Sequence, residues 1–103
     1  MSNPKPVQLN ELELATALSK LKGWTLANGK LHREYKFADF VSAFAFMAGA
    51  ALVAQGMDHH PEWFNVWGTV RIDLATHDAG GITALDVTLA LAMEELAKRQ
   101  LGK

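Results

Sequence analysis

The fold of this chain is decided by residues 63–75, which read WFNVWGTVRIDLA. Two strand-like runs, 63–67 and 69–75, flank Gly68. The second run alternates three apolar residues, Val70, Ile72 and Leu74, with polar ones. A period of two is typical of a strand that buries one face and leaves the other in water. The stretch therefore predicts an antiparallel hairpin, in which the start of the first strand lies opposite the end of the second.

A second hairpin comes earlier in the chain, with arms over residues 24–27 and 30–37. Asn28-Gly29 joins the arms, and this pair suits the positive φ angles of a type I′ turn. The longer arm places Leu31, Tyr35 and Phe37 on one face, which predicts a strand with one buried side. Arg33 falls on the same face, a position that suits a strand end or a contact with a partner.

Three helices are predicted around these strands, over residues 10–21, 39–56 and 83–100, with Gly56 ending the second. The first and last begin with a polar residue and an acidic one three positions later, Asn10 with Glu13 and Thr83 with Asp86. The order is then α-β-β-α-β-β-α. It predicts an α+β fold, a four-stranded antiparallel sheet with helices packed on one face.

Composition limits what the chain can be. Its 103 residues suit one domain over 1–103, with residues 1–7 as a loose tail. A net charge of −1 gives no reason to expect binding to nucleic acid or to anionic lipid. The absence of cysteine excludes disulfides and thiolate metal sites, and it fits a cytoplasmic protein.

The stretch over 40–57, which includes most of the second helix, has 18 residues without a charge, close to the shortest membrane span. Six alanines and two glycines keep its hydrophobicity modest, so we expect a buried helix and no membrane contact. Its apolar surface covers more than half of its circumference, which predicts a homo-oligomer. One apolar stripe comprises Phe40, Phe44, Met47 and Ala51, and Val41, Ala45, Ala48 and Leu52 lie beside it.

Three of the four histidines flank the hairpin that decides the fold: His59 and His60 precede it, and His77 follows it. Pairing of the two strands brings His60 near His77, and an extended conformation before Pro61 lets the adjacent rings diverge. Imidazoles exchange protons near neutral pH, so the cluster indicates acid–base chemistry. The plainer interpretation is that His59 and His60 are only polar residues at the end of a helix. His32, on the wet face of its strand, is expected to be solvated or hydrogen-bonded.

A metal site is the other chemistry that histidines support. Neighbouring histidines seldom bind one ion, and the chain has neither an H-x₃-H nor an H-E-x-x-H spacing. We therefore expect no metal, and a small zinc hydrolase stays as an alternative. No glycine-rich phosphate loop and no redox cofactor motif is visible.

Five segments carry the strongest pattern in the chain: Asp58-His59-His60-Pro61-Glu62-Trp63-Phe64-Asn65-Val66, Leu74-Ala75-Thr76-His77-Asp78, Leu85-Asp86, Gly23-Trp24 and Phe44-Ala45-Phe46-Met47. Together they resemble the pterin-4a-carbinolamine dehydratase family. The resemblance runs from about Gly23 to the last helix, and it implies a homodimer or a homotetramer. It implies an enzyme that converts 4a-hydroxytetrahydrobiopterin to quinonoid dihydropterin and water. That reaction recycles the pterin spent by an aromatic amino-acid hydroxylase, notably phenylalanine hydroxylase, and it needs no cofactor because the pterin is the substrate.

The resemblance also implies roles for individual residues. His59, His60 and His77 would be catalytic, and Asp86 and Trp24 would support the site. The substrate-binding residues would be Asp58, His59, His60, Pro61, Trp63, Ala75, Thr76, His77 and Asp78. Gln55 departs from the glutamate that family members often carry there, which puts a carboxylate contribution in doubt. The alternative function is a non-catalytic dimerisation or transcriptional-cofactor module of the same fold.

Overall fold

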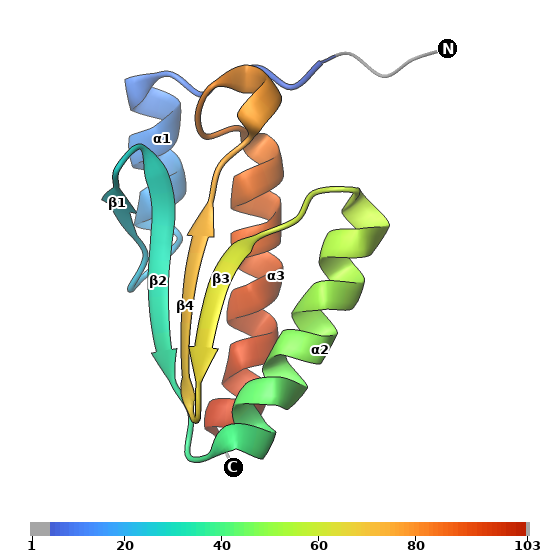
Figure 1. Ribbon diagram of the computed structural model, residues 1–103. Helices are drawn as coiled ribbons and strands as arrows, with labels where there is room; N and C mark the ends of the chain where they lie inside the picture. Colours follow the sequence, from blue (N-terminus) through green and yellow to red (C-terminus); the bar gives the residue numbers. More distant parts are fainter. Residues whose placement is uncertain (1–4, 103) are drawn as a thin grey trace.

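A computed structural model describes residues 5–102 of the chain (Figure 1). The predicted α-β-β-α-β-β-α order and the α+β class are confirmed. Residues 1–4 of the predicted tail lie outside the described part, and residues 5–7 form neither helix nor strand. The elements are α1 (Glu11–Ser19), β1 (Thr25–Ala27), β2 (Lys30–Lys36), α2 (Phe40–Met57), β3 (Glu62–Val66), β4 (Thr69–Leu74), the 3₁₀ turn η1 (His77–Ala79) and α3 (Ala84–Leu101).

The four strands form one antiparallel sheet in the order β1-β2-β4-β3. The helices cover one face of this sheet and the other face is open, as Figure 1 shows. The two predicted hairpins are joined side by side through β2 and β4, whose register pairs Leu31 with Leu74 and Tyr35 with Val70. The strand with the clearest alternation, β4, is therefore an inner strand, and Val70, Ile72 and Leu74 are buried beneath the helices.

Gly68, in the turn between β3 and β4, lies close against the backbone of Phe37 at the end of β2. The amide of Phe37 donates to the Gly68 carbonyl at 2.8 Å. A Cβ atom on Gly68 would lie 2.4 Å from the Phe37 carbonyl oxygen, a distance that real Cβ atoms do not show. Trp67 next to it has φ +50° and is exposed. Glycine is therefore required here, and the hairpin is held in place against the end of β2.

Helix α2 buries a different face from the apolar stripe that stands out in the sequence. The buried residues are Ala43, Phe46, Ala50 and Ala54. Phe44 of the apolar stripe is 56% exposed, and Leu52 beside it is 77% exposed. Small side chains let α2 approach α3 closely, since a Cβ on Gly49 would lie 3.2 Å from a methyl carbon of Leu96. Although α2 is long and apolar enough to cross a membrane, it packs here as one helix of a globular fold.

Arg33 turns inward and contacts residues of its own chain. Its guanidinium lies 4.5 Å from the centre of the Tyr35 ring, and its Nε atom is 3.6 Å from a carboxylate oxygen of Glu94 in α3. Trp24 donates its indole N–H to Glu94 at 2.8 Å, and the Tyr35 hydroxyl donates to the same carboxylate. We call these four residues the Glu94 cluster. Burial, reinforced by the hydrogen bond to Glu94, raises the pKa of Tyr35 above its usual range.

Candidate active site

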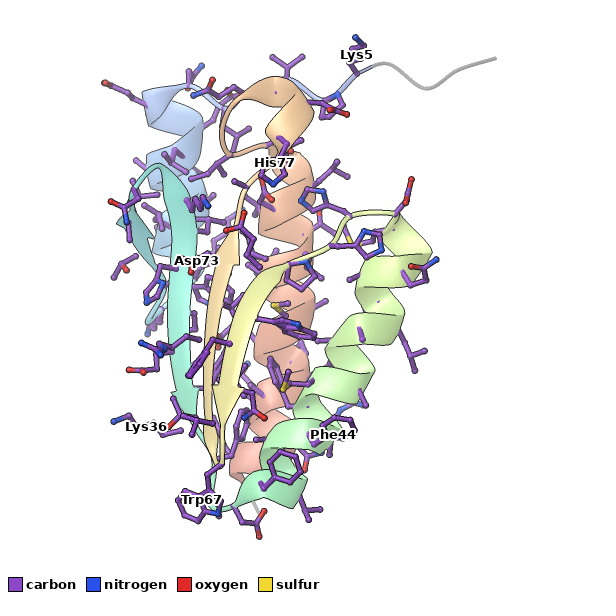
Figure 2. All side chains as sticks on the ribbon, in the orientation of Figure 1. Lys5, Lys36, Phe44, Trp67, Asp73 and His77 are labelled. Atoms are coloured by element: carbon purple, nitrogen blue, oxygen red, sulfur yellow. The ribbon has the colours of Figure 1, made fainter. Side chains whose placement is uncertain are left out.

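A cavity of about 420 Å³ lies beyond the ends of β3 and β4, and two segments of the chain line it. Figure 2 shows His77 at this end of the sheet, opposite the end that carries Trp67. The lining residues are Asp58, His59, His60, Pro61, Glu62, Ala75, Thr76, His77 and Asp78. The structure therefore brings the three flanking histidines around one cavity, whose volume is typical of a small-molecule site.

Two residues suggested for the site lie elsewhere. Trp63 is half-buried, packs against the hydrophobic core and pairs with Ile72 of β4. Trp24 is buried in the core and its indole N–H is bound by Glu94. Neither side chain lines the cavity. Any part that Trp24 plays would have to act through the packing of the core.

The end of α2 positions His59 and His60 at the cavity. The helix runs past Gly56, the predicted stop, and ends when Asp58 takes a left-handed conformation with φ +50° and ψ +41°. The backbone N–H of His59 then donates to the Ala54 carbonyl at 3.0 Å, which closes the turn. Left-handed residues are common at this point of a helix, and aspartate tolerates them better than most residues. This turn directs the chain into β3.

His59 belongs to a buried network that continues into the first turn of α3. Its Nε2 atom lies 2.5 Å from Oδ1 of Asp86, a carboxylate with no solvent exposure. The second carboxylate oxygen accepts from the Thr83 backbone N–H at 2.9 Å and from the Thr76 hydroxyl at 2.8 Å. The Thr83 hydroxyl lies 2.8 Å from that of Thr76 and completes the network. The Thr76 hydroxyl and the Thr83 N–H both donate, so the arrangement suits a carboxylate, to which His59 can present Nε2–H.

His60 and His77 are held on the exposed rim of the cavity. Nε2 of His60 lies 2.9 Å from the side-chain oxygen of Gln55, one turn back in α2. The strand β4 stops at Leu74, one residue before the predicted end at Ala75, and His77 begins η1. Its side chain is 83% exposed, and its Nε2 atom lies 3.5 Å from a carboxylate oxygen of Glu62.

The three imidazoles share one feature: each has Nε2 against an oxygen acceptor, on Asp86, Gln55 or Glu62. An imidazole that donates from Nε2 exchanges protons through Nδ1. The site can therefore take up and release protons at more than one point around its cavity. From the sequence, Gln55 stood out only as a departure from the glutamate that family members often carry. Glu62 was given no role, although it directly follows the His-His-Pro motif.

Two further observations describe the electrostatics. The Glu62 carboxylate also accepts a 2.6 Å salt bridge from Lys30 of β2. That hydrogen bond, with the nearby charges of Glu62 and Asp73, raises the pKa of Lys30. Within residues 5–102, no three side chains of His, Asp or Glu gather in a way that could hold a metal ion. Each of the three histidines instead faces an oxygen acceptor, on Asp86, Gln55 or Glu62.

Comparison with known proteins gives one consistent family. The family model described as pterin 4 alpha carbinolamine dehydratase matches residues 7–96. A curated relative from Solibacter usitatus is 60% identical over 90 residues, which are 87% of this chain and 95% of the relative. A relative from Rhizobium johnstonii is 48% identical over 97 residues, covering 92% of this chain and 96% of its own. The names of both assign pterin-4-alpha-carbinolamine dehydratase activity provisionally.

A solved structure agrees with these relatives. The crystal structure of a protein named transcriptional coactivator/pterin dehydratase from Brucella melitensis superposes with a TM-score of 0.84 at 47% sequence identity. The likeness covers 87% of this chain and 98% of that one. The matched family and the three-histidine cavity therefore occur together in one fold.

Proposed function

This chain belongs to the pterin-4a-carbinolamine dehydratase family, and from that premise we propose that it dehydrates 4a-hydroxytetrahydrobiopterin to quinonoid dihydropterin. The observation that carries the proposal is the convergence of His59, His60 and His77 on one cavity. The cavity of about 420 Å³ has the size of a small-molecule site, and a bicyclic pterin ring is a small molecule of that class.

The reaction is a balanced transfer of protons. The C4a–O bond breaks, and the departing hydroxyl takes a proton from an acid and leaves as water. A ring nitrogen of the pterin gives a proton to a base, and its electron pair forms the new double bond. Substrate and products differ only by water, so no electrons are exchanged with a cofactor. Each well-placed acid or base contributes about 10²–10⁴-fold.

The surroundings of each imidazole suggest how the work is divided. His59 is fixed by Asp86 in a buried network, so its ring orientation and tautomer are determined before the substrate arrives. His60 and His77 stand on the rim, where protons exchange readily with water. We assign the acid and base roles to His59 and His60. His77 orients the pterin or shares the role of base.

The proposal extends to the setting of the enzyme. It acts in the cytoplasm without a cofactor and regenerates the pterin used by an aromatic amino-acid hydroxylase. The outward face of α2, which exposes Phe40, Val41, Phe44 and Leu52, supports a homodimer or homotetramer because lone globular domains seldom leave such a surface in water. Size-exclusion chromatography with light scattering tests the assembly: a monomer at micromolar concentration would refute this part.

The experiment for the activity is a stopped-flow assay with chemically generated 4a-hydroxytetrahydropterin. His60→Ala and His77→Ala should keep the fold, since both side chains lie on the rim, and should each slow dehydration by at least about tenfold. His32→Ala is the matched control. This fourth histidine pairs with Asp73 on the open face of the sheet at 2.8 Å, and its loss should leave the rate unchanged.

Two results would count against the proposal. Wild-type rates equal to the spontaneous reaction would favour the non-catalytic module, a role compatible with the coactivator name of the Brucella structure. Equal effects of the His32 and His60 substitutions would show that the cavity has no special part in the reaction.

A further inference from the structure

His77 lies in a short loop, residues 76–81, whose two ends are joined by hydrogen bonds; we call it the His77 loop. The Thr76 N–H donates to the Gly81 carbonyl at 2.9 Å, and the Gly81 N–H donates to the Thr76 carbonyl at 3.4 Å. The Thr76 hydroxyl also donates to the buried Asp86 carboxylate at 2.8 Å. The base of the loop is therefore tied to the network that holds the histidine cavity.

The tip of the loop is open to solvent. His77, Asp78 and Gly80 are all exposed, and the His77 side chain is 83% exposed. The distance from Nε2 of His77 to the Glu62 carboxylate, 3.5 Å, is long for a hydrogen bond. The position of the His77 ring therefore depends on how firmly the backbone of the loop is held.

The segment that precedes α1 crosses the end of this loop (Figure 1). The Leu9 N–H donates to the Ile82 carbonyl at 2.8 Å. The Gln8 side chain lies over Gly81, because a Cβ atom there would be 2.7 Å from Nε2 and 3.1 Å from Cγ of Gln8. The backbone of Gly81 is outside the left-handed region, so the lack of space accounts for the glycine. We call Gln8 and Leu9 the strap.

The strap is itself anchored to α1. Asn10 follows it and caps the helix: its side chain accepts from the Glu13 N–H at 2.8 Å, and its own N–H donates to Glu13 at 2.9 Å. Leu9 packs against the hydrophobic core. A cavity of about 250 Å³ lies between the strap, the β1–β2 turn and Ile82, so packing is incomplete on this side. The two contacts of the strap therefore link a fixed helix to the His77 loop.

We propose that Gln8 and Leu9 are positioning residues, which hold the His77 loop in place for the dehydration. The inference rests on the proposed function and adds to it two residues that do not line the histidine cavity. The strap limits the movement of the loop backbone, and thereby the movement of the His77 ring relative to the pterin. A displacement of about 1 Å at a reacting group can lower a rate about 10²-fold.

Substitution of Leu9 tests the hydrogen bond of the strap. Leu9→Pro removes the N–H that binds the carbonyl of the buried residue Ile82. Leu9→Ala is the matched control, because it loses the same side chain and keeps the N–H. In the stopped-flow assay, kcat of Leu9→Pro should be at least about fivefold below that of Leu9→Ala. Equal kcat values for the two variants would overturn the role of Leu9.

Substitution of Gln8 tests the cover over Gly81 without a change in backbone hydrogen bonding. Gln8→Ala removes the side chain, and Gly81→Ala adds a methyl group where that side chain lies. Because both disrupt one contact, each should lower kcat at least about threefold, and the double variant should lose no more than Gly81→Ala alone. Gln8→Met keeps a side chain of similar length and should keep the wild-type kcat. Additive losses, or a fully active Gln8→Ala, would overturn the role of Gln8.

The same substitutions in a His77→Ala background distinguish positioning from a general effect on the fold. This background lacks the ring that the strap positions. Leu9→Pro and Gln8→Ala should therefore change its kcat by less than about twofold. Equal losses in the two backgrounds would show that the strap only stabilises the fold, and would overturn the proposal.

Amide hydrogen exchange separates this inference from the proposed function. The Thr76 N–H joins the two ends of the loop, and it should exchange at least about threefold faster in Gln8→Ala than in the wild type. Unchanged exchange refutes the strap even when the wild type is fully active. A wild-type protein that does not accelerate dehydration refutes the proposed function, and the exchange rates still decide whether the strap holds the loop.

Discussion

Helix α3 carries two carboxylates that are surrounded by hydrogen-bond donors, and their settings differ. Asp86, in the first turn, is fully buried and is bound by His59, Thr76 and Thr83. Glu94, two turns later, accepts from Trp24 and Tyr35. Both networks tie α3 to the rest of the fold. Only the Asp86 network includes a side chain that lines the histidine cavity.

From this difference we propose that Glu94 is a structural carboxylate and Asp86 a functional one. A carboxylate whose donors are all core groups stabilises packing, and its loss affects the free energy of unfolding. A carboxylate that binds an imidazole at a cavity wall also determines which nitrogen of that ring can exchange a proton. The predictions below test this division, beginning with the largest effect.

Asp86→Asn should reduce kcat for dehydration by about a hundredfold while the protein stays folded. The amide oxygen has to face the two donors on Thr76 and Thr83, which directs the NH₂ group at Nε2 of His59. The imidazole then loses its acceptor and must adopt the other tautomer. Glu94→Gln is the matched control and should leave kcat unchanged. A fully active Asp86 variant in the stopped-flow assay would contradict the division.

Glu94→Ala should act on stability instead: it should lower the free energy of unfolding by about 2–4 kcal/mol. The substitution leaves the Trp24 indole and the Tyr35 hydroxyl without an acceptor and removes the negative charge opposite Arg33. Urea denaturation followed by tryptophan fluorescence measures the change. An unfolding midpoint equal to that of the wild type would show that the Glu94 cluster adds nothing to stability.

Alkaline pH should weaken the Glu94 cluster. Tyr35 has a raised pKa in the folded protein, so it holds its proton at a pH where the unfolded chain has begun to lose it. Its contribution is therefore complete below the unfolded value of about 10, and it declines as the pH rises above that value. Urea denaturation of the wild type and of Tyr35→Phe between pH 8 and pH 11 should show a smaller alkaline loss in the variant. Parallel curves would contradict the prediction.

The smallest effect concerns the rim. Gln55→Ala removes the acceptor of His60, and because that hydrogen bond is exposed to water its loss should lower kcat by no more than about threefold. The contrast with Asp86→Asn compares an exposed acceptor with a buried one in the same assay. A loss as large as that of the Asp86 variant would mean that Gln55 has a direct part in the reaction.

The sequence predicted the elements of the fold well where periodicity carries the information. The alternation in β4 and the Asn28-Gly29 turn identify strands and a hairpin because both signals are local. The pairing of β2 with β4 was not predicted, since the register between two distant hairpins depends on the helices that pack above them.

Helix α2 shows why periodicity fails in other places. Nearly every residue in it is apolar, so hydrophobicity marks no single face. The structure selects the face by size, because Ala43, Ala50 and Ala54 allow close contact that the exposed phenylalanines would prevent. The helix ends at Asp58 in place of Gly56, because Asp58 and not Gly56 takes the left-handed conformation.

For the site, the sequence supplied the three histidines and the hairpin that brings them together. It also supplied Asp86, through the resemblance to the family. Glu62 and Gln55 were not predicted as partners of His77 and His60, because these contacts depend on the course of the chain around the cavity. The Glu94 cluster joins residues far apart in sequence, so the chain alone gives no signal of it.

The most direct test of the central claim is the rate at which the protein, dialysed against EDTA and free of added cofactor, dehydrates chemically generated 4a-hydroxytetrahydropterin. The account predicts full activity before and after dialysis, because the three imidazoles supply the proton transfers. A rate no faster than the spontaneous reaction, or activity that returns only when zinc is added, would contradict it.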